Sequence, residues 1–227
     1  ITGKAYFMNE EYIVGEGVLI PRKDTELLVE QAYKIIRNGK GTQCIIDFCT
    51  GSGCIIISLA KLLDHATVQY KAVATDNSDI AINYAKKNLE NLKPGHSIEI
   101  LQHDLLKENS NKIKFICDKY DVVISNPPYI KTNDIDMLEN QVRNFEPCEA
   151  LDGGIDGLKY YRKLVLTAKE ILKFEGYLLF EIGYDQKDEV GNILQKSEMF
   201  SEIIFKKDYS GNFRVVIARR KKCEKQI

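Results

Sequence analysis

Short apolar runs alternate with stretches of helical periodicity along most of this chain, and this alternation narrows the possible folds more than any other feature. The runs predict strands at residues 44–48, 70–75, 97–101, 120–125 and 177–182, and the helical stretches predict helices at 24–37, 53–63, 78–91 and 158–173. Regular alternation implies parallel strands, right-handed crossovers and helices on both faces of one sheet. Two last apolar runs, at 200–206 and 213–218, flank a short polar turn and predict an antiparallel hairpin at the sheet edge.

The first residues differ from the rest of the chain. Residues 4–20 predict a β-hairpin lead-in, so we divide the chain into a hairpin and linker at 1–23 and one α/β domain at 24–227. Asp24 or Thr25 is expected to cap the helix that follows. The chain opens on Ile1 rather than Met, and we therefore expect further residues upstream.

Composition excludes several classes of function. A net charge of -1 argues against a dedicated nucleic-acid binder with a broad basic face. The longest apolar run, at 54–60, is far shorter than the roughly 20 residues of a membrane span, and no signal peptide opens the chain, so we expect a cytoplasmic protein. The 6 cysteines form no CxxC pair and there are only 3 histidines, so we expect no metal site and free thiols in a reducing cytosol.

The residues after the apolar run 120–125 carry the most chemical information: Asn126, Pro127, Pro128 and Tyr129. Two prolines cannot continue a sheet, so the chain must turn at the carboxyl end of this strand. Open α/β sheets bind their ligands at that end. A plain strand exit is the alternative, but an amide before the prolines and an aromatic ring after them favour a functional turn, which we assign to catalysis.

The connection after the run 44–48 has the composition of a ligand-binding turn. Glycines let a backbone turn sharply and approach a ligand closely, although a simple tight turn would also use them. No Gly-Lys-Ser/Thr follows, which excludes a P-loop, and Ile56 stands where the dinucleotide pattern needs its third glycine. The residues that we assign to cofactor binding in this loop are Asp47, Phe48, Cys49, Thr50, Gly51 and Gly53.

Acidic residues follow the next two predicted strands. Asp76 and its neighbour Asn77 end the second strand, where a carboxylate can accept both hydroxyls of a ribose. A helix-capping role is the alternative for Asp76. Asp104 and Leu105 follow the third strand and suit an adenine, with the carboxylate on the amine and the aliphatic chain over the ring, or else form an ordinary loop.

A glycine loop, a ribose-binding acid and an adenine-binding acid in this order, followed by Asn-Pro-Pro-Tyr, resemble the class I S-adenosylmethionine-dependent methyltransferases. The blocks at 18–26 and 146–158 closely resemble the release-factor glutamine N5-methyltransferases, the HemK/PrmC family, and the similarity runs from the lead-in to Arg219. The resemblance implies a Rossmann-like seven-stranded sheet, S-adenosylmethionine as cofactor and S-adenosylhomocysteine as product. It also implies a peptide-chain release factor as protein substrate, a monomer, no direct specific nucleic-acid binding, and a small helical domain preceding the catalytic one.

The same resemblance implies roles for single residues. Asn126 Oδ1 and the Pro127 carbonyl would accept the two N–H groups of the substrate amide, while Pro128 and Tyr129 wall the pocket. Cys49 departs from the family, because it stands at the first glycine of the loop, where a β-carbon would either crowd the cofactor or require an unfavourable backbone angle. The residues assigned to the substrate side of the pocket are Pro21, Arg22, Thr25 and Glu26.

Four rival functions remain open at this stage. A ribosomal-protein glutamine methyltransferase is the nearest one. An adenine or guanine amino-group methyltransferase acting on DNA or RNA would use the same Asn-Pro-Pro-Tyr turn on a flipped base. Cys49 permits a binding module of weakened activity, and Asp76 alone would suit a nicotinamide-binding Rossmann enzyme.

Overall fold

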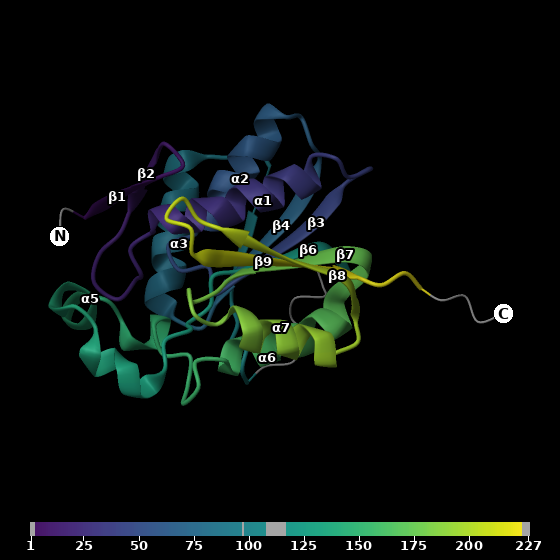
Figure 1. Cartoon of the computed structure of the whole chain (residues 1–227). Helices are drawn as coiled ribbons and strands as arrows, with labels where there is room; N and C mark the ends of the chain where they lie inside the picture. Colours follow the sequence, from purple (N-terminus) through teal and green to yellow (C-terminus); the bar gives the residue numbers. More distant parts are fainter. Residues whose placement is uncertain (1–2, 97, 108–116, 224–227) are drawn as a thin grey trace.

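The computed structural model describes residues 3–96, 98–107 and 117–223, which form a three-layer α/β domain with a small antiparallel hairpin at its N-terminal side (Figure 1). The central layer is a seven-stranded sheet in the order β5-β4-β3-β6-β7-β9-β8. The first five strands in this order run parallel, and β9 is antiparallel to both β7 and β8. The predicted fold class is confirmed.

The strands lie close to their predicted positions. Residue 97 of the predicted third strand lies outside the described residues, and β7 begins five residues before the prediction because the chain enters the strand directly from the preceding helix. The bounds in the main sheet are β3 (Gln43–Phe48), β4 (Tyr70–Asp76), β5 (Ile98–Gln102), β6 (Tyr120–Ser125), β7 (Leu172–Glu181), β8 (Phe200–Lys207) and β9 (Phe213–Arg220).

Helices cover both faces of the sheet, as Figure 1 shows. Successive strand residues point to opposite faces, so Ile45 packs in one apolar cluster with α1, α2 and α3, and Ile46 packs in the other with α6 and α7. Both faces are therefore buried, which explains why the central strands read as continuous apolar runs. The helix bounds are α1 (Glu26–Ile36), α2 (Cys54–His65), α3 (Asp79–Leu92), α5 (Asn140–Phe145), α6 (Lys159–Ile171) and α7 (Lys187–Lys196).

The predicted N-terminal hairpin is present as β1 (Lys4–Phe7) paired with β2 (Glu10–Ile13). Its turn is Met8-Asn9, and both residues have positive φ, as a type I′ hairpin turn requires. The Asn88 side chain of α3 bonds both backbone groups of Ile13, at 2.7 and 3.0 Å. The hairpin is thereby held against the helical layer.

Two local expectations were wrong. The sequence analysis placed no helix between the predicted strands 177–182 and 200–206, yet α7 fills this connection and covers the sheet. Neither Asp24 nor Thr25 caps α1 through its side chain; a 3-10 turn, η1 (Lys23–Thr25), leads into the helix instead. The Thr25 hydroxyl bonds elsewhere, in the core of the site described below.

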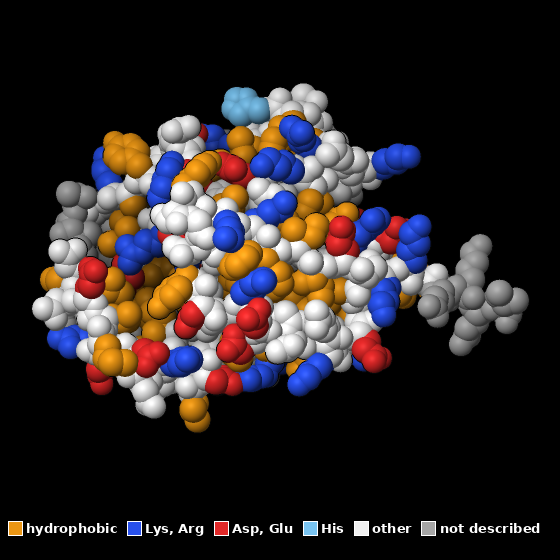
Figure 2. Space-filling model, in the orientation of Figure 1, with side chains coloured by type: hydrophobic (Ala, Val, Ile, Leu, Met, Phe, Trp, Pro, Cys, Tyr) orange, Lys and Arg blue, Asp and Glu red, His pale blue; other side chains and the backbone are white. Residues whose placement is uncertain are grey.

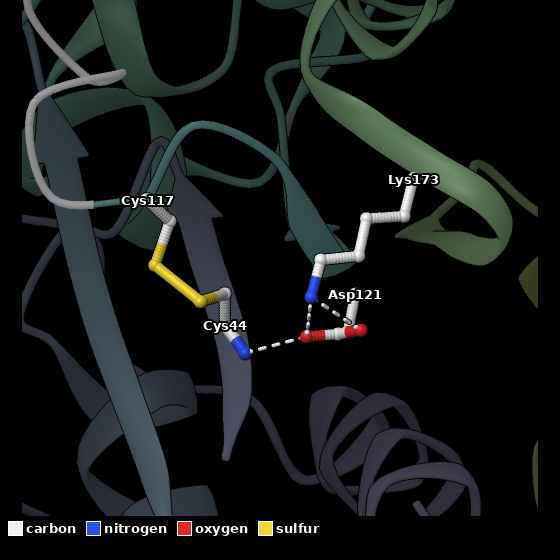
Figure 3. Close-up of a disulfide and its surroundings, with 4 residues drawn as sticks. All are labelled: Cys44, Cys117, Asp121 and Lys173. Atoms are coloured by element: carbon white, nitrogen blue, oxygen red, sulfur yellow. Dashed lines mark hydrogen bonds and ion pairs between the residues drawn. A yellow bond between two sulfur atoms is a disulfide. The ribbon is translucent and has the colours of Figure 1, made fainter. Parts of the chain in front are cut away.

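The expectation that all cysteines are free thiols was also wrong. Cys44 of β3 and Cys117, which precedes β6, form a disulfide with a Cα–Cα distance of 6.3 Å (Figure 3). Beside it, Asp121 accepts from the backbone N–H of Cys44 at 2.8 Å and pairs with Lys173 at 2.8 Å. Neighbouring parallel strands bring these thiols together, a proximity that a separation of 73 residues hides in the sequence.

Candidate active site

A deep pocket opens at the carboxyl ends of β3, β4 and β6. The strand order reverses between β3 and β6, because β4 and β5 lie on one side of β3 and the later strands lie on the other. Such a topological switch point leaves a crevice in which open α/β sheets bind ligands. The pocket holds about 930 Å³ of empty space including its open mouth, enough for a nucleoside-sized ligand.

Twelve of the residues that the sequence singled out border this one pocket. The other six do not border it: Asp47, Phe48, Gly53, Pro127, Tyr129 and Glu26. The bordering residues are Cys49, Thr50, Gly51, Asp76, Asn77, Asp104, Leu105, Asn126, Pro128, Pro21, Arg22 and Thr25.

The loop between β3 and α2 turns through left-handed backbone angles. Cys49, Gly51 and Gly53 have φ of 56°, 56° and 80°. Gly53 precedes α2, and a β-carbon there would approach Ile57 Cδ1 to 3.0 Å. For Cys49 the left-handed backbone angle costs about 1–2 kcal/mol, because its β-carbon approaches the following carbonyl oxygen; a glycine at this position would avoid that cost.

Asp76 ties two pocket loops together. Its Oδ2 accepts from the backbone N–H of Gly51 at 2.9 Å, and its Oδ1 accepts from the N–H of Ser78 at 3.0 Å. Burial raises the pKa of Asp76, while these backbone donors oppose the shift. The Ser78 hydroxyl caps α3 by accepting from Ala81 at 3.3 Å, so Asp76 does not serve as the cap.

The loop after β5 places Asp104 and Leu105 at the border of the same pocket. The Asp104 carboxylate accepts from the N–H of Leu106 at 2.9 Å and pairs with Lys107 at 3.0 Å. Partial burial acts to raise the pKa of Asp104, but the bonds to Lys107 and Leu106 lower it on balance. The carboxylate is therefore charged, and the apolar Leu105 beside it is buried.

Asp47 lies fully buried beneath the glycine loop. Its Oδ2 accepts from Thr50 Oγ1 at 2.6 Å, whereas Oδ1 meets no donor within the described residues. Burial raises the pKa of Asp47 to about 8. Ser52 Oγ, in the same loop and on the pocket wall, is likewise buried without a partner in the described part of the chain.

The Asn-Pro-Pro-Tyr turn leaves β6 on the other side of the switch point. Asn126 is partly exposed to the pocket, and its Nδ2 donates to Thr25 Oγ1 at 3.3 Å. The Tyr129 hydroxyl points inward and donates to Glu181 Oε1 at 3.3 Å. Burial raises the pKa of Tyr129, so its hydroxyl keeps its proton at neutral pH.

The lead-in segment covers one side of the pocket mouth. Arg22 forms an ion pair with the buried Glu146, which draws the lead-in toward the segment before α6. The carboxylate of Glu26 turns away from the pocket and accepts from the N–H of Met8 in the hairpin turn at 2.8 Å. Arg22 therefore stands at the mouth, whereas Glu26 anchors the hairpin.

Several residues of the pocket wall were not assigned to the site in the sequence analysis. Some have a sequence signal, because they belong to the blocks 18–26 and 146–158 that carried the family resemblance. Tyr160 of α6 has none, since helical periodicity does not say which residue reaches a distant loop. The additional wall residues include Gly17, Val18, Leu19, Ile55, Ser78, Ala81, His103, Pro147, Glu149, Ala150 and Tyr160.

The surface carries charges of both signs. On the face in Figure 2, Lys and Arg side chains are interspersed with Asp and Glu and with apolar groups. None of the helices in the described part of the chain combines the length and the apolar character that a membrane span requires.

Comparisons with known proteins agree with this geometry. Residues 23–144 match the family model of the methyltransferase small domain. The chain is 40% identical over 220 residues to the release factor glutamine methyltransferase of Clostridium acetobutylicum, covering 97% of this chain and 74% of that protein. It is 40% identical to the enzyme of the same name from Thermodesulfovibrio yellowstonii, covering 98% and 76%.

Solved structures share the fold. One of them is the release factor-specific protein-(glutamine-N5) methyltransferase from Alicyclobacillus acidocaldarius, with a TM-score of 0.50 and 24% identity over 92% of this chain and 99% of that one. An identity this low shows the fold alone.

Proposed function

The chain belongs to the release factor glutamine methyltransferase family, and on that premise we propose that it methylates N5 of a glutamine side chain in a peptide-chain release factor, the glutamine of its Gly-Gly-Gln loop. The observation that carries the proposal is the shared pocket. The glycine loop and Asp76 border the same cavity as the Asn126 amide, so a cofactor and a substrate amide can meet there.

S-adenosylmethionine is the cofactor that this pocket suits, and when bound it supplies a sulfonium methyl group. Asp76 would accept from the ribose hydroxyls, and Asp104 with Leu105 would hold the adenine; all three residues border the pocket, which supports these roles. Asp47 Oδ1 and Ser52 Oγ are buried without partners in the described residues. They fit a ligand whose charged amino group supplies a donor, at Ser52 on the pocket wall directly and at Asp47 through water.

The Asn-Pro-Pro-Tyr turn would orient the substrate. An amide nitrogen is a poor nucleophile because its lone pair is delocalised into the carbonyl. Asn126 Oδ1 and the Pro127 carbonyl would accept its two N–H bonds, which turns the face of the nitrogen toward the methyl group. A proline suits this use, since its carbonyl accepts while its nitrogen offers no competing donor.

The remaining residues of the turn shape the pocket. Pro128 borders it directly, and Tyr129 supports the turn from behind, where its hydroxyl bonds Glu181. The rate would rise mainly through orientation and electrostatic fit, with the proton leaving the nitrogen after methyl transfer. Neither a nucleophilic cysteine nor a histidine base takes part in this scheme.

We also propose that the protein acts in the cytoplasm as a monomer. Gel filtration coupled to light scattering measures the mass directly, and a mass of twice the chain's 25.9 kDa would contradict the monomer.

The deciding experiment offers labelled S-adenosylmethionine to three substrates in parallel: purified release factor, ribosomal protein and DNA. We expect label in the release factor, at the Gly-Gly-Gln glutamine, as read by mass spectrometry of its peptides. Label in DNA alone would overturn the proposal, and label in ribosomal protein alone would move the substrate to the ribosome.

A further inference from the structure

A buried carboxylate stands directly behind the Asn-Pro-Pro-Tyr turn. Glu181 ends β7, is 1% exposed, and does not border the pocket. Its Oε2 accepts from Thr25 Oγ1 at 2.6 Å and its Oε1 accepts from the Tyr129 hydroxyl at 3.3 Å. Both oxygens are thus engaged, one by Thr25 of the pocket wall and the other by Tyr129 of the Asn-Pro-Pro-Tyr turn, which lie 156 and 52 residues away along the chain.

The direction of these hydrogen bonds determines which end of the Asn126 amide faces Thr25. A threonine hydroxyl has one proton, and an ionised carboxylate can only accept. The Thr25 proton is therefore committed to Glu181, and the Thr25 oxygen can then only accept. Asn126 must present its NH₂ group to Thr25, as observed at 3.3 Å, which leaves Oδ1 for another donor.

We propose that Glu181 is a positioning residue that, through Thr25, holds the Asn126 amide with Oδ1 available to the substrate. The inference rests on the proposed function, because Oδ1 is the atom that accepts the N–H of the substrate glutamine. With the amide reversed, Asn126 would present NH₂ to the NH₂ of the substrate, and the two donors would repel each other. Glu181 never touches the substrate, so its effect passes entirely through the relay.

The relay depends on the charge of Glu181. A protonated Glu181 can donate to Thr25, whose own proton is then free to point at Asn126, and the amide loses its preferred direction. Burial raises the pKa of Glu181 to about 7, although Thr25, Arg214 and Tyr129 oppose that shift. The amide direction is therefore lost as pH falls through this range.

Other titratable groups face Glu181 from every neighbouring element. Arg214 of β9 favours the carboxylate, and Asp24 of η1 disfavours it while pairing with Arg214 at 3.5 Å. Burial raises the pKa of Tyr161 in α6 and of Tyr129 well above the ordinary tyrosine value, and it raises the pKa of Cys54 in α2 to about 12. These three groups therefore stay neutral near pH 7. Glu181 is thus the group of this cluster that changes charge there.

The test compares Thr25→Val, Thr25→Ser and Glu181→Gln by steady-state kinetics with release factor at saturating cofactor. Thr25→Val keeps the shape but removes the relay, and we expect kcat to fall about tenfold or more while KM and cofactor affinity stay within about twofold. Thr25→Ser restores the hydroxyl and should restore kcat. Glu175→Gln, the same change on the exposed part of β7, is the matched control and should leave kcat unchanged.

The pH profile separates positioning from simple packing. We expect kcat of the wild type and of Glu175→Gln to fall on the acid side of about pH 7, and kcat of Glu181→Gln to be lower and flat across that range. An unchanged acid limb in Glu181→Gln, or a Thr25→Val enzyme as fast as Thr25→Ser, would overturn the relay. Wild-type protein that leaves release factor unlabelled would instead reject the proposed function, so the two failures are distinguishable.

Discussion

The backbone N–H of Gly51 donates a 2.9 Å hydrogen bond to Oδ2 of Asp76, across 25 residues of chain. This bond joins the loop after β3 to the end of β4, so the glycine loop and Asp76 form one unit. The other oxygen of Asp76 holds Ser78 at the start of α3. One carboxylate thereby organises three segments at the sheet edge where the cofactor is expected.

Replacement of Asp76 by alanine should weaken cofactor binding. The variant loses the acceptor for the ribose hydroxyls and the support of the Gly51 turn, which together cost about 1–3 kcal/mol, or roughly 5- to 150-fold in Kd. Calorimetric titration with S-adenosylmethionine measures the loss. Asp79→Ala, which changes an exposed acid in the first turn of α3, is the control, and wild-type affinity in Asp76→Ala would refute the ribose role.

Asn126→Ala should abolish most turnover and spare the cofactor. The substrate amide loses one of its two acceptors, and the loss of such an orienting group costs about 100-fold or more in kcat. Single-turnover methyl transfer and cofactor titration are measured on the same preparation. Asn38→Ala, at an exposed asparagine beyond α1, should behave as wild type, and undiminished transfer by Asn126→Ala would remove the amide from the mechanism.

Cys49 should tolerate glycine and reject valine. Glycine adopts a φ of 56° without strain, so Cys49→Gly should bind the cofactor at least as tightly as the wild type. Valine in the left-handed region is strongly disfavoured, and Cys49→Val should unfold more easily than Cys49→Gly by about 1–2 kcal/mol. Urea denaturation gives both free energies, and equal stability of the two variants would contradict the backbone argument.

The stability of the fold should decrease as pH rises through 7 to 8. Burial raises the pKa of Glu181 to about 7 and of Asp47 to about 8, well above their ordinary values of 4.5 and 3.8. The folded state therefore binds protons that the unfolded state has already released. The contribution of these two protonated carboxyl groups to the free energy of unfolding is fully present below about pH 4, in the range of ordinary carboxyl pKa values. It is lost as pH rises and is absent above about pH 8.

Asp47→Asn isolates one of these contributions. Each group changes the free energy of unfolding by at most about 1.4 kcal/mol per pH unit. Between pH 5 and 8 the variant should therefore show a smaller pH dependence of this free energy than the wild type, by the contribution of Asp47. Urea denaturation at several pH values measures the slope. Identical slopes in wild type and variant would show that Asp47 is ionised in the folded protein.

Reduction of the Cys44–Cys117 disulfide should destabilise the protein. Cross-linking residues 73 apart removes conformational freedom from the unfolded chain, worth about 4 kcal/mol for a loop of this length. Denaturation with and without dithiothreitol measures the difference. Cys148→Ser, at an exposed thiol, should leave that difference unchanged, while Cys44→Ser should eliminate it.

Much of the fold was predictable because its signals are local. The apolar runs at β3 and β6 are continuous since both sheet faces are covered, and Pro127 and Pro128 end β6 whatever surrounds them. The α7 helix was not predicted, because Gly191 and polar residues interrupt the helical spacing of its apolar residues. The helix is stabilised by its packing against the sheet.

The positions of the main site segments were also predictable. The glycine turn, Asp76 and the Asn-Pro-Pro-Tyr turn each follow a strand, so parallel topology alone brings them to one edge. The contacts of their neighbours were not predictable. Thr25 was assigned to the substrate side of the pocket and to a helix cap, but its bond to Glu181 was not foreseen, and Glu181 was assigned no role.

The sequence by itself determined the strand–helix order, the end of the sheet at which the pocket opens, and the turn that begins at Asn126, because periodicity, proline and glycine act within a few residues. Only the tertiary structure decided that Thr25 joins Asn126 to Glu181 and that Cys44 meets Cys117. Hydrogen bonds and disulfides need their atoms within a few tenths of an ångström of a set distance. For residues 73 to 156 positions apart, sheet register and helix packing set that distance.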